Sequence, residues 1–185
     1  MSDMKSVLIS IQPKWCELIA SGEKTVEVRK TKPKLETPFK VYIYETQGRT
    51  ETPWIDEDGH HIFKGRGQVI GEFVCNRFTF LDAYYDTNGN RHLCNTAFIK
   101  SCVPNDELFD YIYGKHGEKH GGWAWHISDL VIYDEPKELR EFERACPDNV
   151  RSCAMCRHSG YSGMKCLPLK KPPQSWCYVE QLEGE

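Results

Sequence analysis

Short apolar runs separated by polar turns recur along this chain and predict many β-strands with only a few short helices. Strands are expected in residues 7–11, 24–30, 40–46, 67–81, 123–133 and 175–179, and a hairpin is expected around Asn88-Gly89. Helices are expected from Pro13 to a stop at Gly22, in residues 95–101 and in residues 104–113. Many strands with few helices indicate an α+β fold, a mixed β-barrel with short helices packed against it.

The segment 24–30 alternates polar and apolar side chains and follows the predicted end of the first helix directly. Because successive side chains of a strand point to opposite faces, Thr25, Glu27 and Arg29 are expected on one face. Val26 and Val28 are expected on the other face, toward a core. Two interpretations of the polar row stay open: a solvated face of a half-buried strand, or one wall of a binding cleft.

The bulk composition limits the class of protein. The 185 residues are long enough for one large domain, and 39% hydrophobic content is typical of a globular chain. A net charge of −3 argues against coating nucleic acid by bulk electrostatics but leaves room for a local basic cleft. No run approaches the roughly 18 apolar residues of a membrane span, and no signal-peptide layout is present. We therefore expect a cytoplasmic protein without a membrane partner.

Nine cysteines are unusual in a chain of this length, and their placement divides them into two groups. Cys16, Cys75, Cys94 and Cys102 lie in periodic segments and are expected to be small buried apolar residues. The others fall in the last 40 residues, where a Cys-x-x-Cys pair has one cysteine on each side: Cys146, Cys153, Cys156 and Cys166. Four thiolates close a tetrahedral site, so we expect a structural zinc ion.

Other interpretations of the cysteine-rich segment stay open. His158 could replace one thiolate ligand, an iron–sulfur cluster uses the same ligands, and free thiols or redox pairing need no metal. Cys177 is a fifth candidate ligand, but it lies in a strand pattern beside Trp176 and is expected to be packed.

Several segments together resemble the ASCH domain family, a branch of the PUA-like β-barrel superfamily. They are residues 9–13, 19–30, 69–73, 123–130 and 171–180. The whole sequence resembles a phage and prophage form found in bacteria, which adds a cysteine-bearing segment. The resemblance implies an ASCH or PUA-like barrel in residues 1–142, a zinc-binding insertion in residues 143–170, and the last barrel strand in residues 171–185.

The resemblance also implies an RNA- or nucleotide-binding module, with a cleft between the first helix and the barrel. A charged Lys24 and Arg29 suit phosphate contact, and Glu27 could accept hydrogen bonds from a base edge. The candidate stacking rings are Trp15, Tyr84, Trp123 and Trp125, and a basic strip is formed by Lys30, Lys32, Lys34 and Lys40. Each ring could instead belong to the core, and each lysine to a solvated face. His126 is expected to be a hydrogen-bonded structural residue.

Two other functions are compatible with the resemblance. A small bacterial branch similar to this chain around Lys24 hydrolyses N4-acetylcytidine with a lysine, a threonine and a glutamate. Here Lys24 matches the lysine, Glu27 occupies the threonine position, Thr25 lies nearby, and Glu72 is a candidate for the distant glutamate. The catalytic candidates of such an amidohydrolase, or of a ribonuclease, are therefore Lys24, Thr25 and Glu27. The third possibility is a zinc-stapled phage interaction protein without catalysis.

Overall fold

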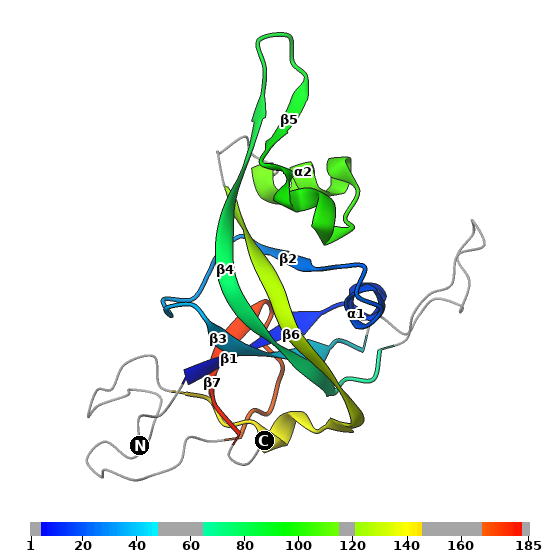
Figure 1. Ribbon diagram of the computed structural model, residues 1–185, viewed down its shortest axis with the longest axis vertical. Helices are drawn as coiled ribbons and strands as arrows, with labels where there is room; N and C mark the ends of the chain where they lie inside the picture. The colour runs from blue at the N-terminus through cyan, green and yellow to red at the C-terminus, as the bar shows by residue number, and fades with distance from the viewer. Residues whose placement is uncertain (1–4, 48–64, 115–120, 146–167, 183–185) are drawn as a thin grey trace, which may run out of the picture. The chain divides into compact units, whose positions relative to one another are not determined.

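A computed structural model describes residues 5–47, 65–114, 121–145 and 168–182 of the chain (Figure 1). It shows a mixed α+β fold with a large β-sheet and few helices. The chain divides into two compact units, which are described in turn below. Two long strands, β4 (Val69–Tyr85) and β6 (Gly122–Lys137), contribute residues to both units.

The first unit comprises residues 1–16, 39–73 and 131–185. Its central strand, β1 (Lys5–Ile11), runs parallel to β3 (Phe39–Glu45) and antiparallel to β7 (Trp176–Glu180). The start of β4 lies beside β3, and the short 3-10 helix η2 (Leu139–Glu141) also belongs to this unit. The apolar run in β1 is buried on both faces, as expected for a central strand. One core cluster contains Leu8, Tyr42, Tyr44, Val69, Phe142, Leu169, Cys177 and Val179.

The second unit comprises residues 17–38 and 74–130. In it β2 (Val26–Arg29) pairs antiparallel with β6, and β5 (Arg91–Cys94) pairs antiparallel with β4. The 3-10 helix η1 (Thr96–Ser101) and the helix α2 (Asn105–Tyr113) complete the unit. Its core contains Val26, Val28, Leu81, Ala83, Leu108, Phe109, Ile112 and Ala124, so α2 places its buried face among strand residues.

The junction between helix α1 (Pro13–Ala20) and β2 has the predicted stop at Gly22. Gly22 has a φ of 80°, a left-handed conformation that favours glycine, and its N–H donates to the carbonyl of Ile19 at 3.0 Å. Two residues later, the backbone N–H of Lys24 donates to the carbonyl of Leu18 at 2.8 Å. These bonds fix the direction in which the chain enters β2.

Most predicted elements are present, but β4 is longer than the pattern predicted and continues to Tyr85. The extension has a partner, because Asp82 to Tyr85 pair with Arg91 to Cys94 across the predicted hairpin. Cys16, Cys75 and Cys177 are buried as expected, whereas the prediction for Cys94 is wrong. Cys94 is exposed because it lies at the end of the short strand β5, whose four residues are largely exposed.

The two described ends of the cysteine-rich segment are paired with each other and with the first unit. Glu143 forms an antiparallel bridge with Pro168, and Arg144 forms one with Val179 of β7. The predicted zinc ligands Cys146, Cys153, Cys156 and Cys166 lie outside the described residues. Among the residues that are described, no helix is both long and apolar enough to cross a membrane.

Candidate functional site

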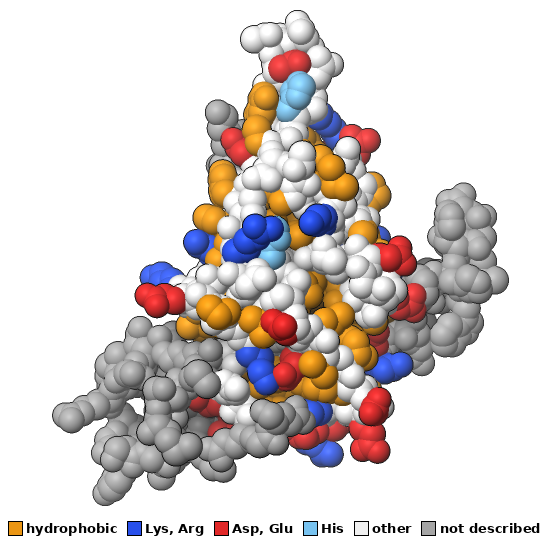
Figure 2. All heavy atoms as spheres, in the orientation of Figure 1, with side chains coloured by type: hydrophobic (Ala, Val, Ile, Leu, Met, Phe, Trp, Pro, Cys, Tyr) orange, Lys and Arg blue, Asp and Glu red, His pale blue; other side chains and the backbone are white. Residues whose placement is uncertain are grey.

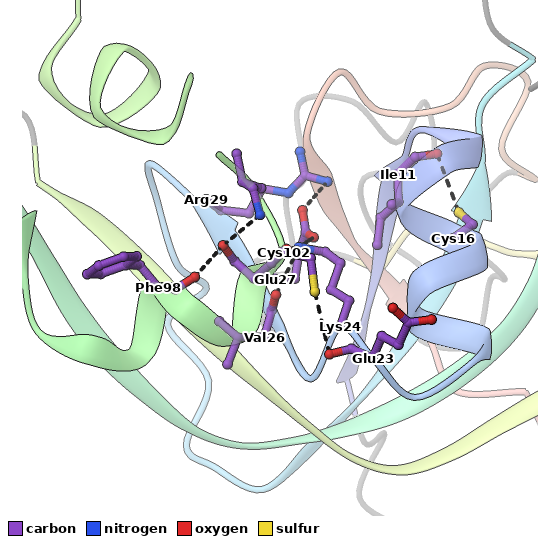
Figure 3. A network of polar contacts seen from close by, with 11 residues as sticks. Ile11, Cys16, Glu23, Lys24, Val26, Glu27, Arg29, Phe98 and Cys102 are labelled. Atoms are coloured by element: carbon purple, nitrogen blue, oxygen red, sulfur yellow. Dashed lines mark hydrogen bonds and ion pairs between the residues drawn. The ribbon is translucent and has the colours of Figure 1, made fainter. Parts of the chain in front are cut away.

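Lys24, the lysine singled out by the sequence, is buried in the second unit with 1% of its side chain exposed. Its Nζ donates to the carbonyl oxygens of Val26 at 2.9 Å and Ser101 at 2.7 Å. The same atom lies 3.1 Å from Oε2 of Glu27 (Figure 3). An ammonium has three N–H donors, and these three acceptors match that number. Lys24 therefore ties the start of β2 to the end of η1.

Glu27 is the centre of a network with one cation on each side. Its Oε2 faces Lys24, and its Oε1 lies 3.1 Å from a guanidinium nitrogen of Arg29. The Glu27 side chain is 8% exposed and that of Arg29 is 13% exposed. The interpretation of the polar row as a solvated face is therefore wrong for Glu27. Its carboxylate tolerates burial because two cations compensate the charge.

Thr25 and Lys30, at the two ends of this segment, are exposed. The backbone of Thr25 bridges two elements, since its N–H donates to the carbonyl of Lys100 and its carbonyl accepts from the N–H of Ile127. The ammonium of Lys30 lies 5.2 Å from the ring centroid of Tyr111. The network is therefore flanked by two polar side chains that solvent reaches.

Arg29 lies opposite Trp123 in the β2–β6 register, so the two side chains share a face of the sheet. Trp123 is surrounded by other rings: Phe80 lies 5.2 Å and Phe78 6.4 Å away between centroids. We call Phe78, Phe80 and Trp123 the aromatic surface. Phe80 is 50% exposed, and the ammonium of Lys32 lies 4.1 Å from the centroid of Trp123. Aromatic rings and cations therefore occur together on this face.

The sequence pointed to Trp123 and Lys32 but missed Phe78 and Phe80. Both phenylalanines are at even positions of β4, so alternation places them on one face. Their pairing with Trp123 depends on β4 lying beside β6, which no local pattern reveals.

The other predicted stacking rings have different surroundings. Trp125 lies opposite Glu27 and is fully buried, with its ring 5.5 Å from Phe78 in an edge-to-face arrangement. A stacking role would require this ring to be uncovered. Tyr84 stacks against His92 at 5.2 Å in the β4–β5 hairpin. Trp15 belongs to the first unit, where the ammonium of Lys14 lies 4.2 Å from its ring.

His126 makes a side-chain hydrogen bond, as the sequence predicts. Its Nε2 lies 2.8 Å from Oγ1 of Thr79 on β4, and the residue is 9% exposed. Burial lowers the pKa of the imidazole, and the positive charges of Arg77 and Lys100 lower the pKa further. Burial raises the pKa of the Cys75 thiol, on the neighbouring strand β4, to about 12.

Glu72 and Lys40 form a separate group in the first unit. Lys40 Nζ lies 2.6 Å from one carboxylate oxygen of Glu72, and the hydroxyl of Tyr133 donates to the other at 2.6 Å. Lys40 therefore pairs with a carboxylate, in contrast to the expectation that it belongs to a basic strip with Lys32. Across the described parts of the chain, no group of three or more His, Cys, Asp or Glu side chains is placed to hold a metal ion.

Comparison with known proteins gives a family and a fold. The sequence profile of the ASCH domain family matches residues 9–117. A crystal structure of ASCH from Zymomonas mobilis is similar, with 19% identity, coverage of 97% of this chain and 90% of that chain, and a TM-score of 0.56. A serine-to-alanine mutant of ZmASCH from the same organism has 18% identity, coverage of 98% and 92%, and a TM-score of 0.51. No curated protein matches the sequence.

Proposed function

This chain belongs to the ASCH domain family, a family of PUA-like RNA-binding modules, and on that premise we propose that it binds single-stranded RNA. The binding surface is the aromatic surface of the second unit together with Lys32 and Arg29. The observation that carries the proposal is the position of the Lys32 ammonium, 4.1 Å from the ring centroid of Trp123, whose ring in turn contacts the half-exposed Phe80.

This combination matches the chemistry of single-stranded RNA. Unpaired bases stack on aromatic rings, and each stacked base contributes about 1–3 kcal/mol. Lysine ammonium groups beside the rings contact the phosphates that connect those bases. Phe80 offers an exposed ring, and Lys32 is an exposed cation over the neighbouring ring of Trp123. A net charge of −3 for the chain is compatible with such a local surface, because affinity depends on the charges near the phosphates.

In this proposal the Lys24–Glu27–Arg29 network positions the surface. Glu27 holds the guanidinium of Arg29 at 3.1 Å, and Arg29 shares its face with Trp123. Lys24 neutralises Glu27 from the other side, and two backbone carbonyls accept hydrogen bonds from its ammonium. We therefore assign Lys24 and Glu27 as positioning residues, and we assign phosphate contact to Lys32 and Arg29.

The hydrolase and the non-catalytic phage-protein alternatives stay predictions from the resemblance. An amidohydrolase that uses Lys24 would need its amine to reach the substrate. A side chain with 1% exposure and three acceptors does not favour that role. A free nucleotide or a modified nucleoside is a smaller alternative ligand for the same surface, because its single base could stack on the same rings.

We also propose a structural zinc site formed by Cys146, Cys153, Cys156 and Cys166, from their spacing alone. The bridge between Glu143 and Pro168, which lie on either side of this segment, supports the proposal. Four thiolates would complete the coordination of zinc and leave no position for a substrate.

Titration of a labelled single-stranded RNA at low salt tests the proposed function. We expect binding that weakens as salt increases, and that weakens further in Phe80→Ser and Lys32→Gln variants of the full chain. Absence of binding by the folded protein would contradict the proposal.

A further inference from the structure

A second basic group lies on the face of β2, β6 and β4 that points away from the aromatic surface. His126 is opposite Val26 in the register, and Thr79 is two positions from Leu81 on β4, so both share the face of the core residues Val26 and Leu81. The 2.8 Å contact between Thr79 and His126 confirms that the two side chains meet. Together they lie at one end of the apolar face that α2 covers.

Two exposed cations, Arg77 and Lys100, come from the elements that lie beside this imidazole. Arg77 lies two positions before Thr79 and therefore on the same face of β4. Lys100 belongs to η1, and its backbone carbonyl accepts a hydrogen bond from the N–H of Thr25. Thr25 precedes Val26, which is the partner of His126 in the β2–β6 register. Figure 2 shows that lysine, arginine and histidine side chains reach the surface on the face turned toward the viewer.

The basic cluster of Arg77, Lys100 and His126 has no compensating carboxylate among the residues that the structure describes. The ion pairs found there join other residues, such as Lys24 with Glu27 and Arg91 with Asp110. Burial lowers the pKa of His126, and the positive charges of Arg77 and Lys100 lower it further. Like charges gathered at one point are unfavourable unless an anion joins them.

We propose that Arg77, Lys100 and His126 form a phosphate-binding site. An arginine fork binds two phosphate oxygens at once, and lysine adds a point charge. Because Nε2 of His126 is engaged by Thr79, the imidazole would contact the anion through Nδ1. The site deepens the proposed function and rests on it, since a bound RNA would supply the phosphate from its backbone. Free phosphate is the other source of the same chemistry.

The test uses the full chain with 15N-labelled histidine, with the His126 signals assigned by a His126→Asn variant. The probes are inorganic phosphate, compared with chloride at equal ionic strength, and a short single-stranded RNA. The test variant is R77Q/K100Q. Its matched control is R140Q/K171Q, which removes the same two positive charges from exposed positions of the first unit.

Phosphate is expected to raise the pKa of His126 by about half a unit or more, because an anion favours the imidazolium. RNA is expected to shift the same signals. R77Q/K100Q should abolish both responses, and loss of two phosphate contacts should reduce the salt slope of RNA binding by about 1.4. R140Q/K171Q should behave like the parent protein.

The outcomes separate this site from the proposed function. Binding of RNA with unchanged His126 signals, or with equal affinity in R77Q/K100Q and its control, would overturn the phosphate site and leave RNA binding standing. A response of His126 to phosphate without any binding of RNA would support the site and overturn the proposed function. Unchanged His126 signals with phosphate, together with no binding of RNA, would overturn both.

Discussion

Lys24 and Glu27, three residues apart, form a buried ion pair in which Nζ lies 3.1 Å from Oε2. The same ammonium binds the carbonyl of Ser101, which is 77 residues away along the chain. The most distinctive residues of the family resemblance therefore hold β2 against η1. Removing either charge is expected to act first on the stability of the second unit.

Lys24→Met is expected to destabilise the fold by about 3–5 kcal/mol, because it leaves a buried carboxylate with one cation instead of two. Urea unfolding of the parent and variant proteins measures this difference. The double variant K24M/E27Q should lose less stability than the sum of the single changes, because the carboxylate that Lys24 neutralises is then removed as well. A Lys24→Met protein that keeps its stability but loses RNA binding would contradict the assignment of Lys24 as a positioning residue.

Stability is expected to fall as the pH decreases below the ordinary histidine range, partly through His126. Its folded-state pKa is lowered by burial, Arg77 and Lys100, so the unfolded chain binds this proton at a higher pH than the folded chain. The contribution is therefore complete above an unfolded pKa of about 6.5 and is lost as the pH falls through the folded value. Unfolding free energies between neutral and mildly acidic pH should depend less on pH in His126→Asn than in the parent. Equal dependence would show that His126 is not responsible.

Removal of one exposed ring tests the aromatic surface with little effect on the core. Phe80→Ser is expected to weaken RNA binding by about 1–3 kcal/mol, the contribution of one stacked base, while the free energy of unfolding changes little. Val131→Ser is the matched control, since Val131 is 49% exposed and Phe80 is 50% exposed. Equal affinity of the two variants would show that the ring of Phe80 does not touch RNA.

Protein purified without chelators is expected to contain about one zinc ion per chain, measured by elemental analysis. Cys153→Ser should lose the metal because it removes one of the four predicted thiolates. Cys94→Ser is a suitable control, because Cys94 is exposed and belongs to β5. A metal content below about half an equivalent in the parent protein would contradict the zinc site.

N4-acetylcytidine is expected to release no acetate with this protein, because the ammonium of Lys24 is buried and bound to three acceptors. Acetate release measured in the presence of folded protein tests this. Release that disappears in Lys24→Met, at a temperature where the variant is folded, would favour the hydrolase alternative.

The sequence predicted the elements of this fold better than the environment of the polar row. Alternation correctly placed Val26 and Val28 in a core, since it depends only on the period of a strand. It did not predict the burial of Glu27, because that depends on two cations reaching the same carboxylate and on a carbonyl from η1. Local pattern carries no information about such a distant partner.

The same lack of information about distant partners explains why the sequence predicted only part of the binding surface. Trp123 and Lys32 could be named from residue type, but Phe78 and Phe80 join them only through the pairing of β4 with β6. Trp125 is two residues after Trp123 in β6 and points to the same face, yet it is fully buried. Residue type identified the chemistry, whereas the tertiary pairing decided which rings reach solvent.

The most direct test of the central claim is fluorescence anisotropy of a labelled single-stranded RNA of about ten nucleotides, titrated with the parent protein, Lys32→Gln and Lys171→Gln at several salt concentrations. We predict saturable binding by the parent, a slope of log affinity against log salt that is smaller by about 0.7 in Lys32→Gln, and no change in Lys171→Gln. No binding by the folded parent at about 50 mM salt, or equal slopes in all three proteins, would contradict RNA binding through this surface.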